Sequence, residues 1–349
     1  MREIKKIAHG CAQEFAVAND MSNGLDSISD ADLAARAAWL HYAGGLTQSV
    51  IAQRFGISTT RAHRMIARAT RDGLIRVFVD ASVSSCIALE DRLCARYGLA
   101  HCTVAPDLAE TTPTPMRALG QAGASLLMRL IAQHPGEAIG IGHGTTLAAA
   151  VEYLPGCEGG ETRFVSLLGG LTRKFAANPF DVIHKLAEKT GAEAFLMPAP
   201  LFANSADDRR VMMAQDGLRE IMKTIESVQV SVVGIGSVQL PGSLARANVF
   251  DPDTPLDKLQ AEGARAEVLG QFLDANGARV PTPYDGRVMA VDLDDLRGRE
   301  VYALAGGSNK TEAIDAAMLS GVFTGLITDE ATARRLVDDV GARNDPAGQ

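Results

Sequence analysis

The chain has 349 residues, of which 46% are hydrophobic, 22% charged and 5% aromatic, and its formal net charge is −8. These values are typical of a soluble protein with two domains, and they exclude a membrane protein because no apolar run approaches the roughly 20 residues of a membrane helix. The five cysteines form no CxxC pair, and no apolar stretch typical of a secretory signal follows the N-terminus, so we expect a cytoplasmic protein with free thiols.

Residues 1–28 show no sustained periodicity, and we expect a flexible leader there. Three helices are then predicted over ADLAARAAWLHYA, QSVIAQRF and TTRAHRMIARATRD. Their expected N-terminal caps are Ser29 or Asp30, Thr47 and Ser58, and glycines at 44–45, 56 and 73 are expected to end them. The β-rich run LIRVFV follows at residues 74–79 and predicts a wing.

The second and third helices have the spacing of a helix-turn-helix, with the expected inward residues Leu46, Val50, Ile51, Phe55, Ile57, Ala62, Ile66 and Ala69. Residues 46–79 carry six arginines and one acidic residue, a local charge of +5 that leaves −13 for the remainder. A basic segment on an acidic chain indicates a local anion-binding surface. We therefore predict that residues 29–80 form a winged helix-turn-helix that binds double-stranded DNA, the alternative being a small helical module with solvated arginines.

The third helix is the predicted recognition helix, because the N-terminal end of that helix enters the major groove in this motif. Four of its residues would reach base edges, and two arginines would contact phosphates. The base-edge residues are Thr59, Thr60, His63 and Arg64, the phosphate contacts are Arg61 and Arg68, and the predicted DNA-binding set also includes Thr47, Gln48 and Ser58.

A linker helix is predicted within residues 81–98, and the pattern then changes for residues 99–349. Seven short apolar runs alternate with helical segments: HCTVAP, EAIGIGHG, TRFVSLLGG, AEAFLMPAP, VQVSVVGIGSV, REVYALAGG and TGLITDE. This alternation predicts a mostly parallel sheet with helices on both faces, which is a Rossmann-like α/β domain.

Glycine-rich turns follow three of these predicted strands, at residues 140–146, 234–237 and 305–310. Glycine lets backbone amides approach an anion, and a helix N-terminus adds partial positive charge. Ligands of open α/β sheets bind outside the carboxyl ends of the strands, so the three turns predict one ligand site. Thr145, Thr146, Ser308 and Lys310 would complete a phosphate cradle there.

Two nucleotide-binding motifs match these turns only weakly. A dinucleotide site would need a third glycine where Leu147 stands, and an acidic residue after the next strand, which instead ends in Gly169 and Gly170. A P-loop fails because GGSN, rather than spaced glycines, precedes Lys310. A sugar phosphate fits the turns better, and we predict neither a cofactor nor a metal.

Two further residues have open roles. Asp274, in FLDANG, could bind sugar hydroxyls or could form an Asx turn after a helix. His143 could line the pocket or could pack inside its own turn.

At these motifs the sequence resembles the SorC family of sugar-binding transcriptional regulators, from about Asp30 to Arg335. The resemblance rests on LHYAGGLTQSVIAQRFGISTTRAHRMIARA, GIGHGTTLAAAVEYLP, VSLLGGL, GAEAFLMPAPLFA, VVGIGSV, GQFLDANG and LAGGSNKTEAIDAAMLSGVFTGLITDEATA. It implies a winged helix-turn-helix followed by a domain resembling phosphosugar isomerases and deaminases. It also implies a homotetramer whose affinity for operator DNA changes when a sugar, polyol or phosphosugar binds.

The resemblance also implies an effector site. The family's motifs fall on Gly144, Thr145, Thr146, Gly236, Asp274, Gly306, Gly307 and Lys310, and the complete predicted set adds Gly142, His143, Gly169 and Gly170. The sequence departs from many members at His143 and Thr145. The start AAWLHYAGGLTQ resembles regulators of erythritol catabolism, which implies a polyol or polyol phosphate as the effector.

The alternative class is an enzyme, a phosphosugar isomerase or deaminase with an accessory helical domain. Such chemistry needs a positioned general base, and only Asp274 or the pair Asp329 and Glu330 could serve. An enzyme would not need the arginine-rich third helix, so we predict a regulator without catalytic residues.

Overall fold

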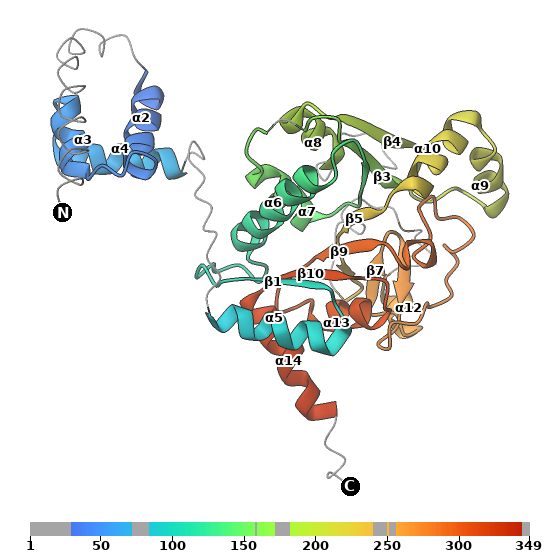
Figure 1. The fold of residues 1–349 in the computed structure, drawn as a ribbon. Coiled ribbons are helices and arrows are strands. Elements are labelled where there is room, and N and C mark those ends of the chain that lie inside the picture. Colours follow the sequence, from blue (N-terminus) through green and yellow to red (C-terminus); the bar gives the residue numbers. More distant parts are fainter. Residues whose placement is uncertain are drawn as a thin grey trace, which may run out of the picture. The chain divides into compact units, whose positions relative to one another are not determined.

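The computed structural model describes residues 29–71, 84–157, 159–171, 182–239, 250 and 256–343. The chain divides into two compact units, Met1–Val79 and Asp80–Gln349 (Figure 1). Within the described part of the chain, no helix is long and apolar enough to cross a membrane.

The N-terminal unit contains α2 (Asp30–Tyr42), α3 (Gln48–Phe55) and α4 (Thr59–Arg71). Each begins at a predicted cap: Ser29 accepts a hydrogen bond from the Asp32 amide (3.1 Å), Thr47 from that of Val50 (3.4 Å) and Ser58 from that of Arg61 (3.2 Å). Gly56 ends α3 with φ at 64°, a left-handed conformation that favours glycine. The predicted wing at residues 74–79 lies outside the described residues.

Small side chains fill the core of this unit, which consists of Ala34, Ala37, Ala38, Ile51, Ala52, Ala62, Ile66 and Ala69. Alanines let the helix axes approach closely, so a few larger residues complete the packing. Most of the predicted inward residues are buried or partly buried, but the prediction for Val50 was wrong, since this residue is 44% exposed. Ile51 and Ala52 face the core, which turns the preceding position toward the outside of α3.

The C-terminal unit is built on a seven-stranded sheet in the order β1-β10-β9-β5-β2-β3-β4, with every neighbouring pair parallel. The strands are β1 (His101–Ala105), β2 (Ala138–Ile141), β3 (Arg163–Gly170), β4 (Glu193–Pro200), β5 (Val230–Val233), β9 (Glu300–Leu304) and β10 (Gly325–Asp329). Each coincides with one of the seven predicted apolar runs. The predicted parallel α/β sheet is therefore confirmed.

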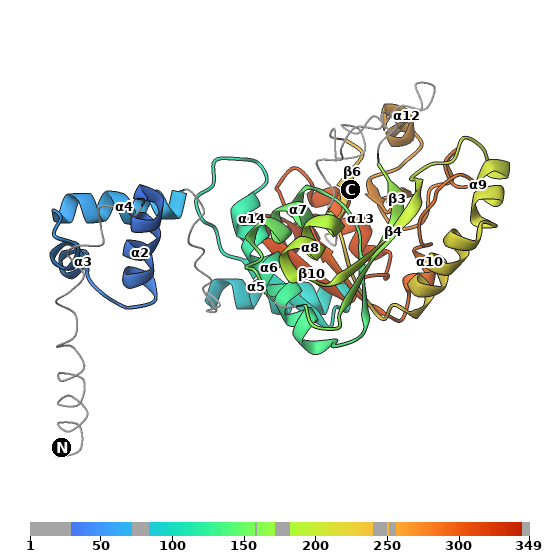
Figure 2. The same cartoon turned by 90° about the horizontal axis from the view of Figure 1, so that it is seen from above.

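Helices cover both faces of this sheet, as the two views of the ribbon show (Figures 1 and 2). On one face, α6 (Met116–Gln133), α7 (Thr145–Tyr153) and α8 (Val182–Thr190) bury one apolar cluster. On the other, α5 (Ser84–Tyr97), α10 (Asp216–Ser227), α13 (Thr311–Leu319) and α14 (Glu330–Arg343) bury a second. Alternate strand residues serve the two clusters, for example Val232 and Val233, which explains why the strands read as continuous apolar runs.

A second sheet, which the sequence did not predict, follows β5. It is antiparallel in the order β6-β7-β8 and consists of β6 (Gly236–Ser237), β7 (Ala266–Val268) and β8 (Gln271–Leu273). The described part of the unit also contains the short helices α9 (Ala206–Met213) and α12 (Leu256–Ala261) and a 3-10 turn at Asp294–Leu296.

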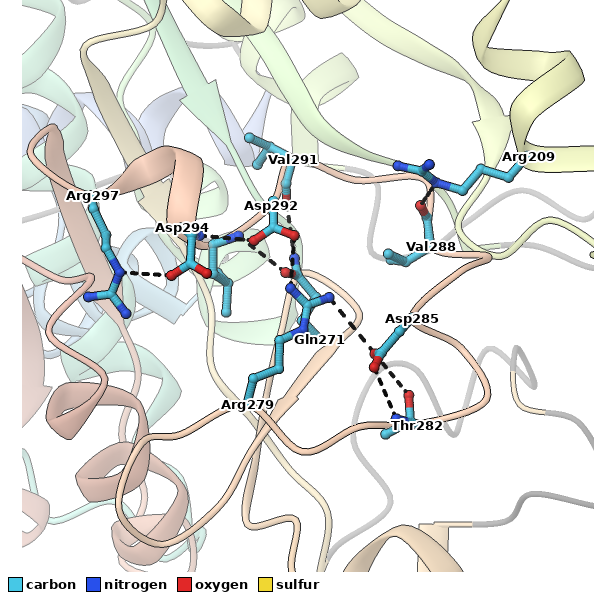
Figure 3. A network of polar contacts seen from close by, with 11 residues as sticks. Arg209, Gln271, Arg279, Thr282, Asp285, Val288, Val291, Asp292, Asp294 and Arg297 are labelled. Carbon is cyan, nitrogen blue, oxygen red and sulfur yellow. Dashed lines mark hydrogen bonds and ion pairs between the residues drawn. The ribbon is translucent and has the colours of Figure 1, made fainter. Parts of the chain in front are cut away.

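A polar network fixes the segment after β8, residues 279–297 (Figure 3). Arg279 pairs with Asp292 at 2.8 Å and lies 3.8 Å from Asp285. Gln271 is buried and bridges the chain by donating to the Val291 carbonyl (2.9 Å) and accepting from the Leu293 amide (3.1 Å). The segment thereby stays against the end of β3, where the Gly169 amide donates to the Met289 carbonyl at 2.8 Å.

Gly277, in the turn after β8, is expected to be the most sensitive glycine of this region. Its φ is +79°, and an added Cβ would collide with the backbone of Ser320. Gly277→Ala should therefore lower the free energy of unfolding by about 2 kcal/mol, because backbone strain and overpacking act together. Gly263 is the matched control, since its φ is +100° but nothing lies within 4 Å of a Cβ. Gly263→Ala should lower the free energy of unfolding, measured with urea, by about 1 kcal/mol. Equal losses in the two variants would contradict the argument that packing against Ser320 adds to the cost at Gly277.

Candidate functional sites

The outer surface of α4 carries the predicted DNA contacts. Thr59, Thr60, Arg61, His63, Arg64 and Arg68 are all exposed, whereas Ala62, Ile66 and Ala69 face the core. Arg61, Arg64 and Arg68 line an open hollow together with Met65 and with Asp30 from the start of α2. The geometry thus gives α4 one buried apolar face and one exposed basic face, which is the requirement for a recognition helix.

The remaining predicted DNA contacts lie near the start of α3 and α4. Thr47 and Ser58 have their side-chain oxygens engaged as helix caps. Gln48 lies beside the recognition helix, because its Oε1 is 3.3 Å from Nδ1 of His63. The two helix starts are therefore held together by side chains that are themselves exposed or half-buried.

The three glycine turns of the larger unit meet at one edge of its sheet. They follow β2, β5 and β9, which are adjacent and parallel, so all three lie at the carboxyl edge. The first turn leads into α7 and the third into α13, and neither helix has a side-chain cap. Two uncapped helix N-termini at the same edge favour an anion, because their first amides and dipoles point toward it.

The first turn is tightly built around its glycines. The Gly142 amide donates to the Val232 carbonyl (2.8 Å), and Gly144 has φ at 131°, a conformation that other residues rarely adopt. Thr145 is half-buried at the helix start, while Thr146 is buried and donates its hydroxyl to the Leu304 carbonyl at 2.8 Å. Thr146 thus joins α7 to β9 and positions the turn.

His143 lies inside this turn with its Nδ1 buried and without a hydrogen-bond partner among the described residues. The residue as a whole is half-buried. Burial lowers the pKa of the imidazole to about 4, so the ring is neutral at pH 7. A neutral ring with one unsatisfied nitrogen can form a hydrogen bond with a ligand hydroxyl group, and it adds no positive charge to that of Lys310.

The third turn is held by the end of β10 and the first turn of α14. The Gly307 amide donates to Asp329 Oδ2 (2.8 Å) and to the Thr332 hydroxyl (2.9 Å). An added Cβ on Gly306 would collide with Asp329, and one on Gly307, whose φ is +106°, would lie 2.6 Å from the Thr114 hydroxyl. Neighbouring atoms therefore leave no room for a side chain at either glycine. Lys310 follows them as the half-buried N-cap residue of α13.

Glu267 joins this edge, although the sequence analysis missed it. The residue is 7% exposed on β7, and its carboxylate lies over Gly236. Burial raises its pKa to about 7, while a hydrogen bond from the Gly270 amide (2.7 Å) and the nearby charge of Lys310 oppose the shift. A single acidic residue within AEV matches no sequence motif, so its position beside the glycine turns is evident only from the pairing of the small sheet.

Three other predicted residues lie in two different places, Gly169 and Gly170 at the glycine turns and Asp274 away from them. Gly169 and Gly170 end β3 beside β2, at the same edge as the turns. Asp274 lies in the turn after β8, where its Oδ1 accepts from the amides of Asn276 (2.8 Å) and Ala278 (2.9 Å). This is an Asx turn after a strand, not after a helix, and it packs through Gly277 on the far end of α13 from Lys310. The structure therefore does not bring Asp274 to the glycine turns.

The acidic pair considered for enzyme chemistry is engaged in structural contacts. Asp329 accepts from Gly307 and from both the amide (2.9 Å) and the hydroxyl (2.7 Å) of Thr332. Glu330 accepts from the Asp107 amide (3.2 Å) and pairs with Arg334 at 2.5 Å, and the Arg334 hydrogen bond is the largest cause of its lowered pKa.

An arginine-bearing helix-turn-helix joined to an α/β unit with a polar site at its carboxyl edge defines a ligand-responsive transcriptional regulator. Comparison with known proteins agrees. Residues 40–76 match the family described as "Winged helix-turn-helix DNA-binding", and residues 81–338 match the family described as "Putative sugar-binding domain". The chain belongs to the SorC family of sugar-binding transcriptional regulators, and it is a regulator rather than an enzyme.

Individual relatives are similar over nearly their whole length. The chain is 46% identical to the erythritol catabolism regulatory protein EryD of Brucella abortus over 312 residues, which cover 89% of this chain and 98% of the relative. It is 31% identical to the transcriptional regulator LsrR of an Enterobacter species, covering 89% and 94%. The crystal structure of the full-length sorbitol operon regulator SorC from Klebsiella pneumoniae has a TM-score of 0.70 at 25% identity, covering 89% and 100%.

Proposed function

We propose that the protein regulates a polyol catabolic operon and that its effector is a short polyol phosphate of the erythritol type. The observation that carries this proposal is the 46% identity to the erythritol catabolism regulator across 98% of that protein. The chemistry of the carboxyl edge supports it. Lys310 and the two uncapped helix starts suit a phosphate, while Glu267 and neutral His143 suit hydroxyl groups.

The proposed effector contacts come from the first and third turns and from the neighbouring glycines. Thr145 and Lys310 would contact the phosphate, and the glycines would let the ligand approach the backbone. The full proposed set is Gly142, His143, Gly144, Thr145, Thr146, Gly169, Gly170, Gly236, Glu267, Gly306, Gly307 and Lys310. Asp274 is omitted because its turn packs through Gly277 against the far end of α13 from Lys310.

Calorimetric titration of the full-length protein tests the effector. Erythritol phosphate is expected to bind, and Lys310→Met should weaken that binding about tenfold, because a charge-assisted hydrogen bond to phosphate is lost. Erythritol and inorganic phosphate are the comparison ligands. The exposed Lys223→Met on α10 is the control variant and should bind like the wild type. Binding of unphosphorylated erythritol alone, insensitive to Lys310→Met, would assign the effector as the free polyol.

We further propose a homotetramer that binds paired operator half-sites through α4 and acts in the cytoplasm, beside its DNA. The proposed DNA contacts are Thr47, Gln48, Ser58, Thr59, Thr60, Arg61, His63, Arg64 and Arg68. Effector and operator must then change each other's affinity by the same factor, and a useful switch needs roughly 1–3 kcal/mol of such coupling.

A further inference from the structure

The C-terminal turn of α5 is tied to α13 by a partly buried polar cluster. Asp315, on α13, is 8% exposed, and its Oδ1 accepts from Arg96 Nη2 (2.8 Å) and from the Tyr97 hydroxyl (2.6 Å). Arg96 and Tyr97 are the last two residues before Gly98, where φ is +66°. The Arg96 guanidinium also lies 4.9 Å from the centre of the Tyr97 ring, so the two side chains are held as a unit.

The helix that carries Asp315 begins at the third glycine turn. Asp315 lies about one helical turn after Thr311, the first residue of α13, so continuous helical hydrogen bonds join it to the turn. A shift of the Gly306–Lys310 turn would therefore be transmitted to Asp315.

A second connection runs through α14. The turn contacts this helix twice, through the Gly307 amide on the Thr332 hydroxyl (2.9 Å) and through Arg335, which donates to the Ser308 carbonyl (2.9 Å). The next residue, Leu336, accepts a hydrogen bond from Arg96 through its carbonyl oxygen. Both helices that hold the end of α5 are thus in direct contact with the same turn.

The position of α5 in the chain indicates a role for these contacts. It is the first described helix after the DNA-binding unit, which ends at Val79, and so the described element that follows that unit most closely in the chain. We propose that Arg96, Tyr97 and Asp315 are positioning residues that transmit occupancy of the Gly306–Lys310 turn to α5 and so set the affinity for DNA. This inference rests on the proposed effector site.

Variants of the cluster should uncouple the two sites without removing either. Tyr97→Phe deletes one hydrogen bond and keeps the ring, whereas Asp315→Asn weakens both bonds. The milder variant is included because Asp315→Asn leaves a largely buried guanidinium without its carboxylate. Tyr302→Phe is the matched control, because it removes a Tyr-to-carboxylate bond to Glu300 (3.1 Å) that involves neither α5 nor α13.

The experiment measures two dissociation constants for the full-length protein. The first is for DNA from upstream of its own coding sequence, measured with and without erythritol phosphate. The second is for erythritol phosphate in the absence of DNA. In the wild type and in Tyr302→Phe, we expect erythritol phosphate to change the affinity for DNA at least fivefold. In Tyr97→Phe and Asp315→Asn, this factor should fall below twofold while erythritol phosphate binds within threefold of the wild-type affinity. If the cluster had a purely structural role, the variants would bind both DNA and erythritol phosphate more weakly, and erythritol phosphate would still change the affinity for DNA by the wild-type factor.

Hydrogen exchange supplies a readout that needs no DNA. Erythritol phosphate should change the protection of α5 amides in the wild type but not in Tyr97→Phe. Wild-type coupling that persists in both cluster variants would overturn this inference alone. A wild-type protein that does not bind erythritol phosphate, or binds it without any change in DNA affinity, would overturn the proposed function and this inference with it.

Discussion

Arg64→Ala is expected to weaken binding to the operator by roughly 10- to 100-fold, corresponding to the ~1–3 kcal/mol of one bidentate contact with a base. Arg64 lies on the exposed side of α4, opposite the buried residues Ala62, Ile66 and Ala69. This placement gives its guanidinium the most direct approach to a major-groove base edge. The loss should also relax the sequence preference at one base pair, so binding to single-base operator variants is the measurement.

Arg61→Ala provides the contrast. Arg61 lines the same hollow as Arg64 and is a predicted phosphate contact, so its loss should weaken binding to all DNA sequences alike. The slope of log K against log salt should fall by about one, whereas the base preference should stay. Arg36→Ala, an exposed arginine on α2 outside the predicted contacts, should change affinity less than twofold. Equal, sequence-independent losses for Arg64→Ala and Arg61→Ala would contradict the assignment of Arg64 to a base.

The large sheet could be predicted from the sequence because its seven strands are buried on both faces. A strand such as β5, with Val230, Val232 and Val233 all buried, must be apolar at nearly every position, and glycines follow it. The helix caps were equally legible, since Ser29, Thr47 and Ser58 each act on the first turn of their own helix. Local chemistry decided both features.

The small sheet could not be predicted, because its strands have two or three residues each and no alternating pattern. Its pairing of Gly236 with Glu267 joins positions far apart in the sequence. For the same reason no sequence pattern pointed to Glu267, and the position of Asp274 relative to the glycine turns could not be predicted. The sequence cannot tell which of two isolated acids the fold places over Gly236 and which it places at the far end of α13 from Lys310.

Glu267→Gln is expected to remove a pH dependence of stability that this carboxyl gives the wild type. The folded-state pKa is about 7 and the ordinary value is 4.5, so the folded protein holds this proton more tightly than the unfolded chain. The stabilisation is fully present below pH 4.5 and is lost as pH rises through about 7. Since one pKa unit is worth ~1.4 kcal/mol, the loss amounts to ~3 kcal/mol.

Urea unfolding at pH 5, 6, 7 and 8, followed by circular dichroism, measures this difference. Trp39, the only tryptophan, lies in the DNA-binding unit, so its fluorescence reports separately on the unit that Glu267 does not belong to. Glu330→Gln is the control of opposite sign. Its lowered pKa, caused mainly by the Arg334 hydrogen bond, means that the ionised carboxylate stabilises the protein at neutral pH. A slope between pH 5 and pH 7 that is unchanged in Glu267→Gln would show that Glu267 is already ionised in the folded protein. The pKa of Glu267 would then not be raised by folding, and its carboxylate would carry a full negative charge beside the proposed phosphate site.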